Sequence, residues 1–434
     1  MAQALKWKTE GRRVVPVSRG ANVGEGGPCR PLNIVMLAPT AFFSDYGCHV
    51  RIYEEARTLQ ERGHRARIFT YHRGRDLPGL DIVRFPSTPG GGRYAMGSSW
   101  HKLLFDALLL ARAALTQRQP PDLIHAFLHE GALVGRVLAR LWNAPLVFDY
   151  QGSLTGEMID HGFLPAGSPM FRRLLGLEKH INNLPEAIVT SSVHAARLLR
   201  DRFECGCPLI HTVPDCVDAR RFSRPDPAQT LRLRQTLGLP ASGRIVGYLG
   251  KLATYQGTDL LLQAAAVLHA RSRDVHFLIM GYQVVEAYRA KAEALGIGQY
   301  VHFTGRVPYE QAPQYLALAN VAVAPKVSET ESNGKLLNYM ALGLPTVAFD
   351  TPVAHEYLGA WGRYAARSPH GLAEALEQTL EEAGAAEVGV QLRERAITRY
   401  SWEQAGERLE QVYRLVLSRS ARRAPVPTAM AGRR

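Results

Sequence analysis

Short apolar runs alternate with amphipathic helical patterns along most of the chain. The runs LNIVMLAP (32–39) and PDLIHAF (121–127), for example, precede helical patterns over 50–62 and 131–142. Apolar runs of this length, alternating with helices, are typical of a parallel sheet whose strands are joined by crossover helices. The pattern therefore predicts an α/β fold.

A second series of the same kind begins after a polar, proline-containing stretch at 223–227. It includes GRIVGYLGK (243–251), VHFLIMG (275–281) and PTVAFD (345–350), again with helical patterns between them. We expect two doubly wound, Rossmann-like halves with a cleft between them. Ligands of such sheets bind beyond the carboxyl ends of the strands, so the strand-to-helix turns should carry the chemistry.

The same patterns predict where the parts of the chain begin and end. The segment YSWEQAGERLEQVYRLVLSRS reads as an amphipathic helix with Ser401 as its N-cap. We predict a tail at 1–30, an N-terminal half at 31–218, a linker at 219–228, a C-terminal half at 229–399, the closing helix at 400–420 and a tail at 421–434.

The chain has 434 residues and a net charge of +13, much of which lies near its two ends. Residues 1–30 carry a net charge of +4, and residues 419–434 contain five arginines and no acidic residue. Both ends lack apolar periodicity, so we predict disordered basic tails, which could contact an anionic membrane. No nucleic-acid-binding motif accompanies the charge, so we expect no nucleic-acid partner.

The number and spacing of the cysteines and the hydropathy of the chain predict whether it binds a metal and in which cellular compartment it lies. The five cysteines are odd in number and lack the paired spacing of a zinc site, so we expect neither a disulfide framework nor a metal. No signal-peptide core and no run of about 18 uncharged apolar residues is present in the sequence. We predict a cytoplasmic protein that could lie at the inner face of the membrane. We interpret the helical pattern at 99–118 as a helix packed on a sheet, because Asp106 interrupts its apolar run, and a membrane-surface helix is the alternative.

The first strand-to-helix turn contains Gly47, just before a predicted helix. Backbone amides at such a helix start could face a phosphate group. A single glycine at this position is also explained by backbone geometry alone.

Several segments, in this order, resemble the family 4 retaining glycosyltransferases of GT-B fold over roughly residues 33–418. They are YGCHVRIYEEARTLQERGHRARIFT (46–70), VPDCVDARRF (213–222), GYLGKLATYQGTDLLLQAAAVL (247–268), VHFTGRV through PTVAFD (301–350) and YSWEQAGERLEQVY (400–413). The resemblance implies a nucleotide-sugar donor on the C-terminal half and a carbohydrate or lipid-linked acceptor on the N-terminal half. It also implies a last helix that crosses back to the first half, and no metal or other cofactor.

The segment SETESNGKLLNYMALGLPTVAFDTP (328–352) matches the family's donor loop. The resemblance implies that Glu331 holds the sugar hydroxyls and that Lys335, at a helix start, faces the diphosphate. Asn338 stands where the family has a glutamate that binds the ribose. We also place Asn333, Gly334 and Leu336 around this ligand. A helix start decorated by exposed acids is the simpler alternative, and Glu329 competes for the role given to Glu331.

The segment GYLGKLATYQGTDLL matches a second phosphate-binding element, in which the family has two cations. Lys251, after Gly250, keeps one of them, although a solvated turn lysine is the alternative. Gln256 stands where the other is expected. The charge of a leaving diphosphate must be stabilised in the cleft, so we expect Lys335 to replace the missing cation.

The segment VFDYQGSLTGEM (147–158) resembles the family's strand end that carries a histidine at the reaction centre, and Gln151 stands in its place. An amide can hydrogen-bond a sugar hydroxyl but cannot act as a general base. We predict that Gln151 and Asp149 lie at the reaction centre, with His125 and His129 as further candidates. For each histidine alone, a hydrogen-bonded structural role is the commoner explanation.

The leading prediction is a retaining, hexosyltransferase-like enzyme of cell-envelope or exopolysaccharide biosynthesis. It moves a sugar from a nucleotide diphosphate to an acceptor hydroxyl. The departures at Gln151, Gln256 and Asn338 support a rival, a catalytically silent GT-B protein that binds a nucleotide sugar or a partner. A nucleotide-sugar epimerase is a third alternative, which would need ionisable groups where Gln151 stands.

Overall fold

The computed structural model describes residues 30–87, 100–271 and 274–423. By its contacts the chain divides into Met1–Pro31 and Leu32–Arg434, and the second unit, described here by itself, contains every helix and strand of the described residues. The predicted basic tails lie almost wholly outside the described residues. No helix among the described residues is long and apolar enough to cross a membrane.

The N-terminal half is built on a seven-stranded parallel sheet of order β3-β2-β1-β4-β5-β6-β7. Its apolar runs form strands because they are covered on both faces: every residue of β4, β5 and β6 is buried. The strands are β1 Asn33–Ala38, β2 Arg65–Thr70, β3 Asp81–Arg84, β4 Leu123–Phe127, β5 Leu146–Tyr150, β6 Ala187–Thr190 and β7 Ile210–Thr212.

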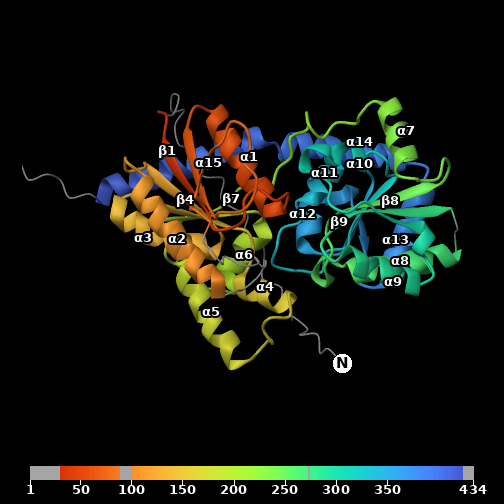
Figure 1. Cartoon of the computed structure of the whole chain (residues 1–434), viewed down its shortest axis with the longest axis horizontal. Coiled ribbons are helices and arrows are strands. Elements are labelled where there is room, and N and C mark those ends of the chain that lie inside the picture. The colour runs from red at the N-terminus through yellow and green to blue at the C-terminus, as the bar shows by residue number, and fades with distance from the viewer. Residues whose placement is uncertain (1–29, 88–99, 272–273, 424–434) are drawn as a thin grey trace, which may run out of the picture. The chain divides into compact units, whose positions relative to one another are not determined.

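Helices cover both faces of this sheet, with α1 and α15 on one side and α2 and α3 on the other (Figure 1). Several begin at serine N-caps, such as Ser153, whose hydroxyl accepts a hydrogen bond from the Gly156 amide. The helices are α1 Gly47–Glu61, α2 Trp100–Thr116, α3 Leu128–Trp142, α4 Leu154–Asp160, α5 Pro169–Asn182 and α6 Val193–Asp201.

The C-terminal half repeats the plan with a six-stranded parallel sheet of order β10-β9-β8-β11-β12-β13. Its strands are β8 Arg244–Lys251, β9 Val275–Tyr282, β10 Val301–Phe303, β11 Val321–Ala324, β12 Thr346–Phe349 and β13 Arg363–Ala365. Its helices are α7 Pro227–Thr236, α8 Thr258–Arg271, α9 Val285–Ala294, α10 Ala312–Leu316, α11 Lys335–Ala341, α12 Pro352–Leu358, α13 Pro369–Glu381 and α14 Ala385–Arg399.

The closing helix, α15 (Trp402–Arg423), returns to the N-terminal half and lies beside α1 (Figure 1). Glu410 on α15 accepts hydrogen bonds from Arg62 at 2.8 Å and pairs with His64 at 3.0 Å. The hydroxyl of Tyr413 lies 2.7 Å from Nδ1 of His125, on β4. The predicted two-half fold with a crossing helix is confirmed, and α15 extends three residues beyond the predicted boundary at 420.

Candidate active site

A cavity of about 370 Å³ lies between the carboxyl ends of the two sheets and is lined by residues of both halves. Ten of the twelve predicted site residues line it, and Asp149 and Leu336 do not. The predicted residues that line the cavity are Gly47, Gln151, Gly250, Lys251, Gln256, Glu331, Asn333, Gly334, Lys335 and Asn338. The turns after β1, β5, β8 and β11 therefore meet, as strand order in parallel sheets requires.

Lys335 lies at the start of α11, and its ammonium group is directed at the turn after β8. Nζ donates a hydrogen bond to Oε1 of Gln256 at 2.8 Å and lies 4.5 Å from the ring centre of Tyr248. Gly250 makes room for it, because a Cβ atom at Gly250 would lie 2.8 Å from this nitrogen. Burial, with a smaller effect from Lys326, lowers the pKa of Lys335 to about 7. Lys335 thus lies beside Gln256, where the sequence predicted that it replaces a cation.

Glu331 is held by Lys326, which follows β11. Nζ of Lys326 lies 2.5 Å from Oε2 of Glu331 and 2.5 Å from the carbonyl oxygen of Ser332. This lysine therefore fixes both the carboxylate and the backbone of the donor loop. Glu329, the competitor for the role of Glu331, instead pairs with Arg367 at 2.8 Å and does not line the cavity.

Lys251 ends β8 and lies 5.5 Å from the ring centre of Tyr255. Burial lowers the pKa of Lys251, and the attraction of Glu331 opposes this change. A lysine in this position is a partly desolvated cation facing the cavity, and the prediction that it is merely a solvated turn residue does not fit.

Asn333 and Asn338 both line the cavity, at the start of α11 and one turn into it. Oδ1 of Asn333 is buried and has no hydrogen-bond partner among the described residues. Leu336 corrects one prediction: its side chain is fully buried in the core, and its amide donates to the carbonyl of Asn333. Leu336 therefore has neither a side chain nor a free amide to offer to a ligand.

Asp149 corrects a second prediction, because its carboxylate is fully buried behind the cavity wall. It accepts hydrogen bonds from Arg51, with Nη2 at 2.7 Å and Nε at 3.0 Å. The Arg51 guanidinium keeps the pKa of Asp149 low against the effect of burial. Asp149 thus positions Arg51, which lines the cavity, and does not itself reach the reaction centre.

The two candidate histidines of this half are structural residues. His125 is fully buried and hydrogen-bonded to Tyr413, and His129 is buried 3.8 Å from Glu178. Burial lowers the pKa of both rings. Neither lines the cavity.

Glu55, His125 and Asp149 are close enough to hold a metal ion, but Arg51 already lies among them. Its Nη2 is 3.0 Å from Glu55 and 2.7 Å from Asp149. A guanidinium group therefore neutralises these acids, and the cluster fits a buried ion pair rather than a metal centre.

Gln151, Glu157 and His161 form a polar strip in the N-terminal half, along the turn after β5 and α4. Nε2 of Gln151 and Nε2 of His161 have no hydrogen-bond partner among the described residues. The lack of a side chain at Gly152 leaves room for two glutamates. A Cβ atom there would lie 2.8 Å from Oε1 of Glu157 and 3.3 Å from Cγ of Glu331. Burial first, and Glu331 second, raise the pKa of Glu157 to about 8.

Sequence reasoning missed Lys326, Glu157 and His161 as lining residues. Lys326 has a recognisable signal, because it follows an apolar strand by two residues. Glu157 and His161 follow Gln151 within one short helix and its end, and only the fold shows which side of that helix faces the cavity.

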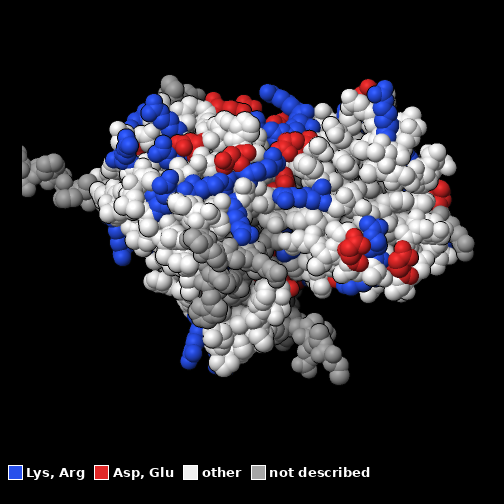
Figure 2. Space-filling view, in the orientation of Figure 1, with Lys and Arg blue, Asp and Glu red and all other residues white. Residues whose placement is uncertain are grey.

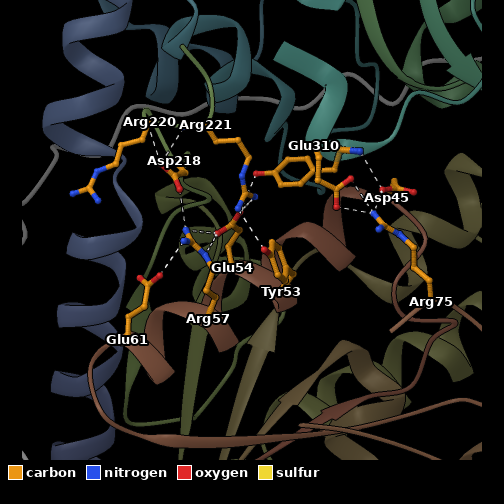
Figure 3. Close-up of polar contacts among 11 residues, drawn as sticks. Asp45, Tyr53, Glu54, Arg57, Glu61, Arg75, Asp218, Arg220, Arg221 and Glu310 are labelled. Carbon is orange, nitrogen blue, oxygen red and sulfur yellow. Dashed lines mark hydrogen bonds and ion pairs between the residues drawn. The ribbon is translucent and has the colours of Figure 1, made fainter. Parts of the chain in front are cut away.

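Polar contacts join the two halves beside the cavity, and α1 carries many of them (Figure 3). The buried Glu54 on α1 accepts hydrogen bonds from Arg221 at 2.6 Å and from the hydroxyl of Tyr309 at 3.2 Å. Arg57, one turn away, donates to Asp218 of the same half at 3.0 Å. Figure 2 shows basic and acidic side chains interleaved in this region.

A second set of contacts lies at the start of α1, around Asp45 (Figure 3). Its carboxylate pairs with Arg75 of the same half at 2.9 Å and with Arg306 of the other half at 2.7 Å. Arg75 also pairs with Glu310 at 2.9 Å. The cations at this edge of the cavity are therefore matched by carboxylates.

The comparisons with known proteins agree with this geometry. Residues 46–216 match the family described as Glycosyl transferase 4-like domain, and residues 243–382 match Glycosyl transferases group 1. The chain is 28% identical over 350 residues to D-inositol 3-phosphate glycosyltransferase of Acidothermus cellulolyticus, covering 74% of this chain and 76% of that protein. It is 28% identical over 330 residues to 2-deoxystreptamine glucosyltransferase of Streptomyces kanamyceticus, covering 69% and 80%.

Solved structures share the fold at low sequence identity. HepE of Anabaena in complex with UDP and glucose has a TM-score of 0.73 at 18% identity and covers 88% of this chain and all of that chain. WaaG, a glycosyltransferase involved in lipopolysaccharide biosynthesis, has a TM-score of 0.68 at 17% identity, with 88% and 99% covered. The motifs, the two-half fold and both family matches agree, and the chain belongs to the family 4 glycosyltransferases of GT-B fold.

Proposed function

We propose that this glycosyltransferase moves a hexose-like sugar from a nucleotide diphosphate to an acceptor hydroxyl, with retention of the anomeric configuration. The observation that carries the proposal is Lys335, a half-buried ammonium group whose partners among the described residues are an amide oxygen and a tyrosine. A half-buried cation that faces a cavity with no carboxylate bound to it is suited to an anionic ligand.

Lys335 and Lys251 would stabilise the leaving diphosphate. Both face one cavity from the ends of neighbouring elements, and burial strengthens their attraction for phosphate oxygens. The sugar would lie against Glu331, held by Lys326, and Asn338 would bind the ribose. The proposal includes no metal ion.

The transfer itself would take place on one face of the sugar. The acceptor oxygen bonds to the anomeric carbon, the bond from that carbon to the phosphate oxygen breaks, and a phosphate oxygen takes the acceptor proton. The protein supplies no base in this scheme, which agrees with an amide at Gln151. Gln151 would instead bind a sugar hydroxyl.

A lipid-linked acceptor of the cell envelope and peripheral contact with an anionic membrane extend this proposal. On α2, Leu103, Leu104 and Leu115 are 64%, 54% and 84% exposed, and the exposed Arg118 follows the end of this helix. Exposed leucines beside cations suit a membrane surface. Sedimentation with anionic vesicles at low salt should deplete the protein from solution, and failure to do so would remove this extension.

The transferase proposal is tested with a panel of UDP-, GDP- and ADP-sugars, following thermal shift and donor hydrolysis in the same samples. One donor should raise the melting temperature and be hydrolysed slowly. Lys335→Ala should remove both effects. The matched control is Lys291→Ala, which removes an exposed lysine paired with Asp259 in the same half, outside the cavity.

The outcomes separate the alternatives. A donor that binds but is never turned over favours the catalytically silent protein. If no donor binds, the assignment of the 328–352 segment to donor recognition is wrong.

A further inference from the structure

The two walls of the cavity differ in charge. The lining residues of the C-terminal half include three lysines and one acid: Lys251, Lys326, Lys335 and Glu331. Those of the N-terminal half include two cations and three acids: Arg51, Lys102, Asp45, Glu157 and Asp215. An anionic ligand is therefore favoured on the first wall and disfavoured on the second.

The two cations of the N-terminal wall are already matched by carboxylates of their own half. Arg51 pairs with Asp149 and Glu55, and its Nη1 lies 3.1 Å from Asp215. Lys102 pairs with Glu130 at 3.0 Å. An incoming phosphate would have to displace these carboxylates, with no gain in charge neutralisation.

The remaining polar side chains of the N-terminal wall are suited to hydrogen-bond the hydroxyl groups of a ligand. Gln151 offers an amide donor and His161 a ring nitrogen, both buried and unpartnered among the described residues. The ring of His161 lies 4.3 Å from that of Tyr255, which fixes the histidine against the other wall. Burial keeps the pKa of His161 low.

Glu157 completes this set of groups. It lies beside Glu331, and the described residues place no cation in ion-pair contact with it. Glu331 and Glu130 favour its neutral form, whereas Lys102 and Lys326 oppose it more weakly. A carboxylic acid in this form both donates and accepts hydrogen bonds, as a hydroxyl group does.

We propose that the acceptor group entering this cavity is an uncharged sugar or polyol, bound by Glu157, Gln151 and His161, and that phosphorylated acceptors are rejected. This inference rests on the proposed transferase function and adds the chemical class of its acceptor. It separates this protein from relatives whose names specify a phosphorylated acceptor, such as the D-inositol 3-phosphate glycosyltransferases.

The test uses the full-length protein, the donor found in the panel, and matched pairs of acceptors: glucose, galactose and myo-inositol, each with its monophosphate. Transfer and acceptor binding, by saturation-transfer NMR in the presence of the nucleoside diphosphate, are measured together with donor hydrolysis. The uncharged member of at least one pair should be used about tenfold or more faster than its phosphate. Equal or better use of the phosphates, or no binding of any uncharged member, overturns the inference.

Two variants test whether Glu157 causes the preference for uncharged over phosphorylated acceptors. Glu157→Gln should raise the KM for the uncharged acceptor about tenfold, because the amide cannot reproduce every hydrogen bond of the acid. Glu157→Lys should shift the preference toward phosphates. Glu286→Gln, an exposed residue of α9 outside the cavity, is the matched control. Unchanged KM and selectivity in both Glu157 variants would contradict the role of Glu157.

Donor hydrolysis distinguishes the two proposals. If no donor is hydrolysed, the transferase proposal fails. If a donor is hydrolysed but acceptor preference follows the phosphates, only the acceptor inference fails.

Discussion

Arg51 and Lys335 face the same cavity from opposite walls, but the pKa of Arg51 is raised and the pKa of Lys335 is lowered. Burial alone would lower the pKa of Arg51, but the attraction of Asp149, Glu55 and Asp215 outweighs it and raises that pKa. Lys335 is bonded to an amide oxygen instead, and burial lowers its pKa to about 7. Carboxylates hold Arg51 within the fold, whereas no carboxylate among the described residues is in ion-pair contact with Lys335, which is left for a ligand.

The largest expected effect follows from removing the acid that holds Arg51. Asp149→Ala leaves a buried guanidinium group with fewer counter-charges, so the free energy of unfolding should fall by about 3–5 kcal/mol. Urea denaturation measures the change. Asp81→Ala on β3 removes one exposed partner of Arg67 and should cost less than about 1 kcal/mol. A stability equal to wild type for Asp149→Ala would show that this acid does not hold Arg51.

The second prediction concerns the pH dependence of Lys335. This lysine binds a diphosphate only in its protonated form, which in the free protein is lost as pH rises through about 7. Donor affinity should be constant below pH 6 and fall by up to about tenfold per pH unit above pH 7. Titration of the donor Kd from pH 6 to 9 measures this, and Lys335→Met should remove the dependence. A Kd that is independent of pH in wild type contradicts the assignment.

The same shift affects stability with the opposite sign. The unfolded chain has an ordinary lysine pKa of 10.5, so it binds more protons than the folded chain between about pH 7 and 10.5. The contribution of Lys335 to the free energy of unfolding therefore rises with pH across this window, while donor affinity falls.

The smallest expected effect concerns the link between the two walls. The Ser332 hydroxyl donates a hydrogen bond to Asp215 at 2.6 Å, and Asp215 also binds Arg51. Ser332→Ala should loosen the donor loop and raise the donor KM about threefold, with acceptor preference unchanged. Steady-state kinetics measure both, with Ser418→Ala on α15 as the control. A KM equal to wild type would mean that this contact does not order the donor loop.

The predictions from the sequence agree best with the structure where they depend on residues that are neighbours in the chain. The turns after β1, β8 and β11 line the cavity as predicted, because each strand end is fixed by its own apolar run. Lys335 was predicted to replace a missing cation near Gln256, and its nitrogen lies 2.8 Å from the Gln256 side chain.

The predictions that were wrong concern residues whose role depends on side chains that are distant in the sequence but close in space. Asp149 follows a strand end and looks like a site residue, but Arg51, 98 positions away in the chain, covers it. Leu336 lies in the donor motif, but helical geometry turns its side chain into the core. Lys326 follows an apolar strand and so has a local signal, but its role depends on an ion pair with Glu331 that forms across a turn.

The two-half α/β fold, the closing helix and the turns that line the cavity could be predicted from the amino-acid sequence, because strand and helix periodicities and short motifs are properties of neighbouring residues. Which cations are neutralised and which face a ligand became visible in the three-dimensional arrangement alone. That outcome depends on carboxylates brought from distant elements, such as Asp149 and Asp215 around Arg51, and on the lack of a carboxylate in ion-pair contact with Lys335 in the described part of the chain. Whether a cation can bind a ligand thus depends on side chains that lie close to it in space, and a local sequence pattern does not contain this information.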